Sequence, residues 1–275
     1  MKTKKLTLLL LTIFSLTNLL TSCTETKAQE IDKVLNSTEP VEKPFLFFNE
    51  SESLVKTRFN APEGYTRVES SESSFGEYLQ NLPLKPHGSQ VHHFDGTLKY
   101  NTSVYCAVVD LTFKGNKNYQ CADAVMRLRA DYLFSQKRYD EIEFLFVSGR
   151  RSNYISYLGG KTPNSKNLWS YLENVFTYAS TLSLDKQLKQ KDVKDLNVGD
   201  VFIKGGSPGH AVIVIDKCFN KDGEVKFMLA QSFMPAQEIQ VLSGDDGQSP
   251  WYNLNFGDYF YSAEYTFTKD QLKSF

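Results

Sequence analysis

The chain has 275 residues, a formal net charge of −1 and a hydrophobic content of 41%. This length and composition supply the core of one large domain or two small ones. A near-neutral chain has no basic field over a domain, which argues against a nucleic-acid partner. Beyond the N-terminus there is no apolar run long enough to cross a membrane.

Residues 1–22 have the pattern of a secretory signal. Three lysines precede an apolar run over residues 6–20, which is too short and wrongly flanked for a stable membrane-spanning helix. The run ends in the sequence Leu-Thr-Ser-Cys at Cys23, which resembles a bacterial lipobox. In such signals the cysteine is lipidated and becomes the mature N-terminus. We therefore expect a lipoprotein signal peptide, with an ordinary secretory peptide and an incidental cysteine as the alternative.

A polar segment follows the lipobox, and we interpret residues 23–60 as a lipidated N-terminus and tether. Residues 44–60 are ambiguous, because their phenylalanines could form an early strand or dock on the core. Several acyl chains on Cys23 would anchor the protein firmly, since each buried methylene contributes about 0.8 kcal/mol. The expected location is the bacterial cell envelope, with the membrane as a partner and a single domain of residues 61–275 facing the periplasm or the cell surface.

Apolar spacing predicts the elements of this domain. The expected helices are 74–82, 119–134 and 168–188. The expected strands are 104–111, 144–149, 210–216 and 224–231, with a further strand before the Gly/Pro turn at 205–209. Helices and strands followed by an antiparallel sheet indicate an α+β domain.

Cys121 is the candidate nucleophile. It lies in the first turn of the helix expected over residues 119–134. The N-terminus of a helix carries a partial positive charge that favours the thiolate, so we expect the pKa of Cys121 to lie below that of a free thiol. Free cysteine is also among the most buried residue types, which leaves an inert buried thiol as the alternative.

His210 is the candidate general base. It starts a strongly apolar strand directly after the turn that contains Ser207 and Gly209. A histidine beside a cysteine can act as its base or form an ion pair with it. The glycines and proline of the turn indicate a backbone bent so that a ligand can approach the imidazole. Asp216 has the same facing parity but lies about 20 Å along the strand, so it is a poor partner. A satisfied core histidine is the alternative.

The hairpin that follows His210 supplies a third polar group, which in such sites orients the imidazole. If Phe219 pairs with Glu224 across the turn, Gln231 lies diagonal to His210 and points to the same side. A register slipped by one residue would favour Ser232 instead. We therefore expect Gln231 beside the imidazole.

Two sequence runs follow the helix-start cysteine. Gly-Asp-Val-Phe-Ile begins at Gly199, and Gly-His-Ala-Val-Ile-Val begins at Gly209. With Cys121, this order resembles the papain-like superfamily, and most closely its NlpC and CHAP branch of bacterial cell-wall peptidases and amidases. The resemblance covers residues 115–235 approximately. It implies a papain-like α+β fold in which the nucleophile-bearing helix packs on an antiparallel sheet.

The same resemblance implies roles for single residues. Cys121 would be the nucleophile, His210 the base and Gln231 the group that orients the imidazole. Backbone N–H groups at the helix start would stabilise the oxyanion, assisted by the preceding glutamine. The expected substrate contacts are Gln120, Ser207, Gly209 and Ser232.

The domain also resembles a family of uncharacterised Bacteroidota lipoproteins. The matching stretches are residues 120–130, 206–214 and 230–237. Two functions remain open. The first is a cysteine peptidase or amidase that acts on an envelope peptide, such as the peptidoglycan stem peptide. The second is a papain-like scaffold kept as a non-catalytic binding lipoprotein.

No cofactor and no metal site are expected. His92 and His93 are adjacent, so on a strand they would face opposite ways and would not chelate together. A Cys106–Cys218 disulfide is compatible with an envelope location and would leave Cys121 free. The tyrosine-rich C-terminus could line a glycan groove or belong to the core or a lid.

Replacing the predicted lipid-bearing residue tests the anchor. Cys23→Ala should leave unprocessed precursor or release the protein from the membrane fraction, because the acyl chains have no other attachment. Fractionation and the mass of the mature chain measure both effects. Normal processing with full membrane retention would exclude anchoring through Cys23.

Overall fold

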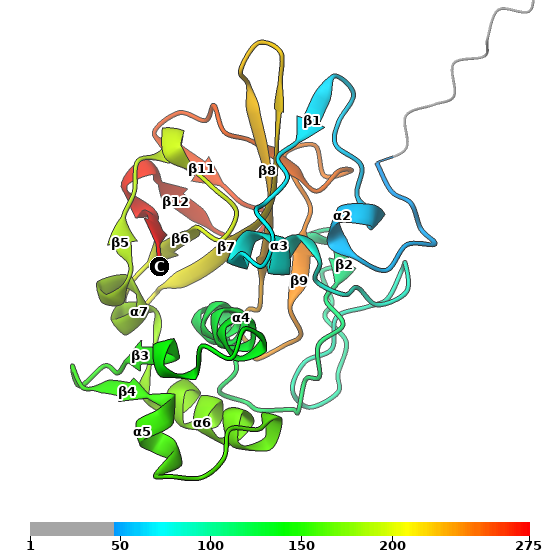
Figure 1. Ribbon diagram of the computed structural model, residues 1–275. Coiled ribbons are helices and arrows are strands. Elements are labelled where there is room, and N and C mark those ends of the chain that lie inside the picture. The colour runs from blue at the N-terminus through cyan, green and yellow to red at the C-terminus, as the bar shows by residue number, and fades with distance from the viewer. Residues whose placement is uncertain (1–46) are drawn as a thin grey trace, which may run out of the picture. The chain divides into compact units, whose positions relative to one another are not determined.

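A computed structural model describes residues 47–275 (Figure 1). The expected signal peptide, Cys23 and most of the expected tether lie outside the described residues. Within the described part of the chain, no helix is long and apolar enough to cross a membrane.

Nine strands of residues 47–275 form one sheet. Its main path is β2-β9-β8-β7-β6-β13-β5, while β1 pairs with β7 and β10 pairs with β8. Every pairing in it is antiparallel, as expected. The bounds are β1 Tyr65–Arg67, β2 Tyr105–Val108, β5 Lys189–Gln190, β6 Val201–Lys204, β7 His210–Asn220, β8 Val225–Gln231, β9 Gln240–Leu242, β10 Trp251–Asn253 and β13 Leu272–Ser274.

Two separate hairpins and several helices complete the described fold. The hairpins pair β3 with β4 and β11 with β12. Their bounds are β3 Glu143–Leu145, β4 Arg151–Asn153, β11 Tyr259–Tyr261 and β12 Thr266–Thr268. The helices are α2 Val55–Arg58, α3 Phe75–Gln80, α4 Cys121–Ser135, α5 Tyr154–Leu158, α6 Ser165–Tyr178 and α7 Thr181–Gln187, with 3₁₀ turns η1 Tyr139–Glu141, η2 Val193–Asp195 and η3 Lys269–Gln271.

The expected helix over 119–134 is α4, which packs against β7 and appears end-on at the centre of Figure 1. The expected helical region 168–188 is two helices, α6 and α7, rather than one. The break falls at Ser180, whose side chain accepts a hydrogen bond from the backbone N–H of Leu182 and so caps α7.

Strand β7 divides the interior into two apolar layers. Ala211 and Ile213 belong to the core that contains Val125 of α4. Val212 and Val214 belong to a second core on the opposite face. The aromatic members of that second core are Phe202, Phe227, Tyr252, Phe260 and Phe267. Alternate residues of one strand therefore join the helical layer to the aromatic layer.

The expected domain boundary at residue 61 is wrong, because residues 47–60 belong to the folded domain. Val55 and Phe59 are fully buried. Phe48 forms a β-bridge with Phe59. The apolar side chains that made this segment ambiguous in sequence fill part of the core.

Asp216 is committed to structure, in agreement with its expected failure to serve His210. It is fully buried and pairs with Arg67 of β1, with an Nε–Oδ2 distance of 2.7 Å. Gln80 of α3 donates its side-chain N–H to the same carboxylate at 2.7 Å. Arg67 also donates to the carbonyl of Lys56 at 2.8 Å. This cluster ties β7 to the segment before residue 61.

Breaking this buried ion pair should destabilise the domain. Arg67→Ala would leave Asp216 buried without its cation, so we expect the free energy of unfolding to fall by about 3–5 kcal/mol. Urea denaturation measures the loss. Arg151→Ala is the matched control, because its ion pair with Glu143 is exposed and such pairs contribute about 1 kcal/mol or less. Equal, small losses for both variants would contradict the prediction.

Candidate active site

A cavity of about 480 Å³ lies at the N-terminus of α4. It brings together most of the residues singled out from sequence, which are Gln120, Cys121, Ser207, Gly209 and His210. The remaining wall comes from the junction of α6 and α7, from the chain after β8 and from the β11–β12 hairpin. The expectation that Cys121 and His210 share one cleft is confirmed.

The hairpin register differs from the expected one at its turn but not at its functional end. Phe219 pairs with Val225 instead of Glu224, an offset of one residue. A β-bulge between Val214 and Asp216 shifts the register by one residue. On the His210 side of this bulge the pairing is therefore the expected one, with Val214 opposite Leu229. The predicted facing near the cavity is therefore correct, although the pairing on which it was based is not.

Gln231 lies beside the imidazole as expected. Its side-chain oxygen is 2.7 Å from Nε2 of His210, and both residues are buried. Ser232, the alternative, is fully buried and donates its hydroxyl to the carbonyl of Gln237 at 2.7 Å. Ser232 does not line the cavity, so its predicted contact with substrate is wrong, because its hydroxyl is used within the β8–β9 connection.

Aromatic rings enclose His210. The ring centroids of Phe233 and Tyr265 lie 4.8 and 4.9 Å from that of His210, and the Phe267 centroid lies 6.1 Å away. Burial and, to a smaller extent, the charge of Lys99 outweigh the hydrogen bond to Gln231, which raises the pKa of His210, and together they lower this pKa to about 4. The imidazole is therefore neutral at physiological pH and can accept a proton.

Cys121 is the first residue of α4, and Gln120 is its N-cap. The carboxylate of Asp123 accepts the backbone N–H of Gln120 at 2.9 Å and fixes this end of the helix. Burial raises the pKa of Cys121 to about 11, although the backbone N–H of Ala211 and those of the first turn favour the thiolate. The expected acidic thiol is wrong, because desolvation outweighs the helix N-terminus.

Cys121 and His210 consequently rest as a thiol and a neutral imidazole. Among the hydrogen bonds of residues 47–275, none joins the Cys121 sulfur to the His210 ring. Catalytic hydrogen bonds are often long in free enzymes and tighten in complexes. The arrangement can support general-base catalysis by the imidazole, but not a preformed thiolate–imidazolium pair.

Gly209 has a steric role in the β6–β7 turn. A Cβ atom there would lie 2.5 Å from Oγ1 of Thr181 and 2.8 Å from the carbonyl oxygen of Lys204. Thr181 in turn donates to the carbonyl of Gly206 at 3.1 Å. The absence of a side chain lets the turn pack against the start of α7, which holds Ser207 in the cavity wall.

Several cavity residues were not identified from sequence. They are Asn118, Ala122, Asp123, Phe176, Ala179, Ser180, Thr181, Gly206, Pro208, Phe233, Met234 and Tyr265. The tyrosine-rich composition of the C-terminus was the one signal that pointed toward Tyr265. Asp123 is buried, and its Oδ1 has no hydrogen-bond partner among the described atoms. Burial raises the pKa of this carboxyl well above its ordinary value.

The Cys106–Cys218 disulfide, which the sequence left open, is absent, and both residues are free cysteines. Cys106 belongs to β2 and Cys218 to β7, with β9 and β8 between them in the sheet. Three strand spacings amount to about 14 Å. A disulfide needs Cα atoms within about 7 Å, so the topology separates the two thiols.

One of the two adjacent histidines, His92, contacts an acidic side chain. His92 lies 3.2 Å from Glu238, measured from Nδ1 to Oε2. Within residues 47–275 there is no group of three or more His, Cys, Asp or Glu side chains placed to hold a metal ion.

The family model described as Domain of unknown function (4846) matches residues 55–168 and 161–274. The chain belongs to this family. The two matched stretches contain every residue of the cavity wall. No curated protein and no solved structure matches the chain.

Alkylation measures the acidity of the cavity thiol. Because the thiolate is the nucleophile, a pKa of about 11 for Cys121 leaves about one thiolate per thousand at pH 8. Its reaction rate with iodoacetamide should therefore rise roughly tenfold per pH unit from pH 7 to 10. Peptide mass spectrometry follows each cysteine separately.

Cys218 is the internal control for this titration. Burial raises its pKa to about 12, and the residue has no exposed surface, so it should react more slowly than Cys121 at every pH. A Cys121 rate that levels off below pH 9 would contradict the assigned acidity.

Proposed function

We propose that the protein is a lipid-anchored envelope hydrolase of the cysteine peptidase or amidase class, with the peptidoglycan stem peptide as the leading substrate. The observation that carries this proposal is one cavity lined by a helix-start cysteine and by a histidine whose ring is held by Gln231. The mixed fold of the domain, in which α4 packs on an antiparallel sheet, supports the finer proposal of a papain-like architecture of the NlpC and CHAP type.

The proposed reaction passes through a thioester. The thiol proton of Cys121 moves to Nδ1 of His210 as the sulfur attacks the carbonyl carbon of the scissile amide. The tetrahedral oxyanion is stabilised by backbone N–H groups at the start of α4 and by the side chain of Gln120. When the C–N bond breaks, the departing amine takes the proton from His210. Water then attacks the thioester, gives a proton to His210 and releases the acid, and the sulfur regains its proton.

The neutral resting pair determines how the proton moves. With pKa values of about 11 for Cys121 and about 4 for His210, an ion pair is strongly disfavoured before substrate binds. Proton transfer therefore accompanies sulfur attack, and His210 serves as a general base. The backbone N–H of Ala211, which favours the thiolate, stabilises the charge that develops on sulfur.

The cavity wall indicates the kind of group that binds. Phe176, Ala179, Phe233 and Met234 give it an apolar side, and its volume is typical of sites that hold a small ligand or a few residues of a peptide. The exposed side chain of Met234 stands at the rim. A short, partly apolar peptide therefore fits better than an extended protein chain.

The anchored location is part of the same proposal. It rests on the basic, apolar and Leu-Thr-Ser-Cys segments of residues 1–23. An envelope location brings the domain to peptidoglycan, which consists of glycan strands and short peptides.

A non-catalytic binding module is the second candidate function. The observation in its favour is the raised pKa of Cys121, since a buried neutral thiol is a weak nucleophile. The same cavity would then bind an envelope peptide without cleaving it.

Hydrolysis of defined peptidoglycan fragments distinguishes the two functions. The full chain, purified in detergent, should release new amino termini from muropeptides, measured by mass spectrometry. Cys121→Ala should abolish release, and His210→Ala should reduce the rate by about 10³-fold or more, because loss of a triad member has effects of this size.

Cys106→Ala is the matched control and should retain full activity, because Cys106 lies in β2 outside the cavity. Release that persists in Cys121→Ala would exclude the thiol mechanism. If the unmodified chain binds muropeptides but cleaves none, and no thiol-directed probe labels Cys121, the binding module replaces the enzyme.

A further inference from the structure

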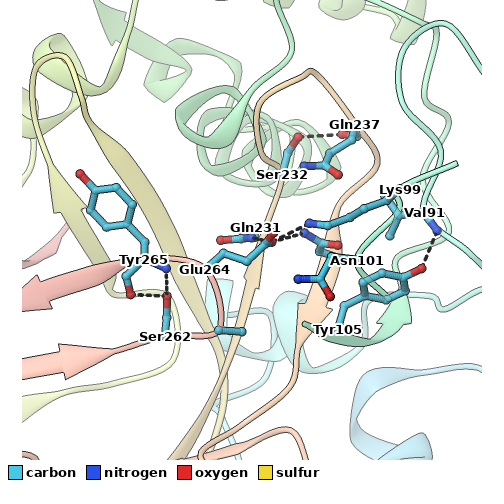
Figure 2. A network of polar contacts seen from close by, with 12 residues as sticks. Val91, Lys99, Asn101, Tyr105, Gln231, Ser232, Gln237, Ser262, Glu264 and Tyr265 are labelled. Atoms are coloured by element: carbon cyan, nitrogen blue, oxygen red, sulfur yellow. Dashed lines mark hydrogen bonds and ion pairs between the residues drawn. The ribbon is translucent and has the colours of Figure 1, made fainter. Parts of the chain in front are cut away.

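A partly buried carboxylate, that of Glu264, lies on the side of Gln231 away from His210. Glu264 lies in the turn between β11 and β12, and one of its oxygens, Oε2, accepts three hydrogen bonds. The donors are Lys99 Nζ at 2.6 Å, Gln231 Nε2 at 2.6 Å and Gln240 Nε2 at 3.2 Å. Figure 2 shows Lys99 and Gln231 converging on this carboxylate from different parts of the chain.

This contact fixes the orientation of the Gln231 amide. A carboxylate paired with a lysine ammonium can only accept hydrogen bonds, so the Gln231 NH₂ group must face Glu264. The Gln231 carbonyl oxygen must then face His210, where its distance to Nε2 is 2.7 Å. The opposite orientation would place two oxygens against each other and is excluded by charge.

The amide orientation in turn fixes the proton on His210. A carbonyl oxygen accepts hydrogen bonds but does not donate them, so Nε2 of the neutral ring must carry the proton. Nδ1 is then left with its lone pair, which is the form needed to accept the thiol proton of Cys121. Lys99, Glu264, Gln231 and His210 thus form one directed chain of donors and acceptors.

The surrounding fold holds this chain rigidly. Lys99 is only 6% exposed, and its Nζ lies 5.5 Å from the centroid of the Phe233 ring, which packs on His210. The turn that carries Glu264 is closed by hydrogen bonds between Ser262 and Tyr265, including the Ser262 hydroxyl to the Tyr265 carbonyl at 2.9 Å. One turn therefore places Glu264 behind Gln231 and the ring of Tyr265 against the imidazole.

We propose that Glu264, neutralised by Lys99, is a positioning residue that orients the Gln231 amide and thereby keeps His210 in the Nε2–H tautomer, with Nδ1 as the base. The catalytic meaning of this assignment rests on the proposed hydrolase function. The tautomer itself is a property of the folded chain and can be measured without any substrate.

Nitrogen NMR of the histidine rings tests the assignment directly. The chain has four histidines, so ¹⁵N-histidine labelling and comparison with a His210→Asn variant assign the ring signals. In the unmodified full chain at pH 7, long-range ¹H–¹⁵N correlations should show His210 entirely as the Nε2–H tautomer. A proton on Nδ1 overturns the proposal, and this measurement needs no variant that perturbs the network.

Glu264→Gln tests the cause of the tautomer preference. The introduced amide can present either its oxygen or its NH₂ group to Gln231, so a measurable Nδ1–H population should appear. Hydrolysis should fall about 10- to 100-fold, as it does when groups that orient catalytic ligands are removed elsewhere. A tautomer that stays wholly Nε2–H in this variant overturns the role of Glu264.

Two further variants separate positioning from folding. Glu264→Gln alone leaves the buried ammonium of Lys99 without its carboxylate. The double variant Lys99→Met with Glu264→Gln removes this charge and should show the same mixed tautomer. Gln240→Leu removes only the longest of the three donors and should leave His210 unchanged. If a mixed tautomer appears while the unmodified chain cleaves no peptide, the positioning role stands and the hydrolase proposal fails. If cleavage is normal in Glu264→Gln with an unchanged tautomer, the positioning role fails alone.

Discussion

The ion pair between Lys99 and Glu264 is the constraint on which the described site depends. Two opposite charges inside a protein are tolerated when they are paired and their remaining hydrogen-bonding positions are filled, because a lone buried charge costs several kcal/mol. Here the carboxylate also receives the amides of Gln231 and Gln240. The loop that carries Lys99, the β8–β9 pair that carries Gln231 and Gln240, and the β11–β12 turn that carries Glu264 therefore meet at one oxygen. His210, at the end of this series of hydrogen bonds, is oriented by Gln231 and Glu264 and not by its own strand alone.

The same apolar enclosure that makes the polar chain necessary also sets the reactivity of the cavity. Burial shifts the pKa of Cys121 upward and that of His210 downward, so both groups are pushed toward their neutral forms. A thiol that is neutral at rest is protected from incidental oxidation and alkylation, which fall with thiolate content. In a hydrolase, such a site would gain its charge only during the reaction. In a binding module, it would stay neutral throughout.

Local patterns in the sequence were sufficient for the elements and for part of the site. The helix that begins at Cys121 followed from composition, and the neighbourhood of His210 and Gln231 followed from strand alternation. Contacts between residues far apart in the chain could not be predicted from these local patterns. Nothing local connects Lys99 or Glu264 to Gln231, since each lies in a loop or turn and they meet only through the fold. The predicted direction of the Cys121 pKa shift was wrong for a related reason. The sequence reveals the start of the helix but not how deeply the thiol is buried. The start of the domain was misplaced because the short apolar segment before residue 61 reveals its partners only in the folded core.

The β-bulge in β7 has a consequence for the design of the strand as a whole. Asp216 lies six positions after His210, an even offset, so a regular strand would present both side chains to the same face. Asp216 instead meets Arg67 and Gln80, and His210 meets Gln231 and the aromatic layer. The additional residue between Val214 and Asp216 acts as a phase shift that lets one continuous strand serve two opposite faces. The part of β7 around Asp216, which pairs with Arg67, can therefore face one side of the sheet while the part that begins at His210 faces the other.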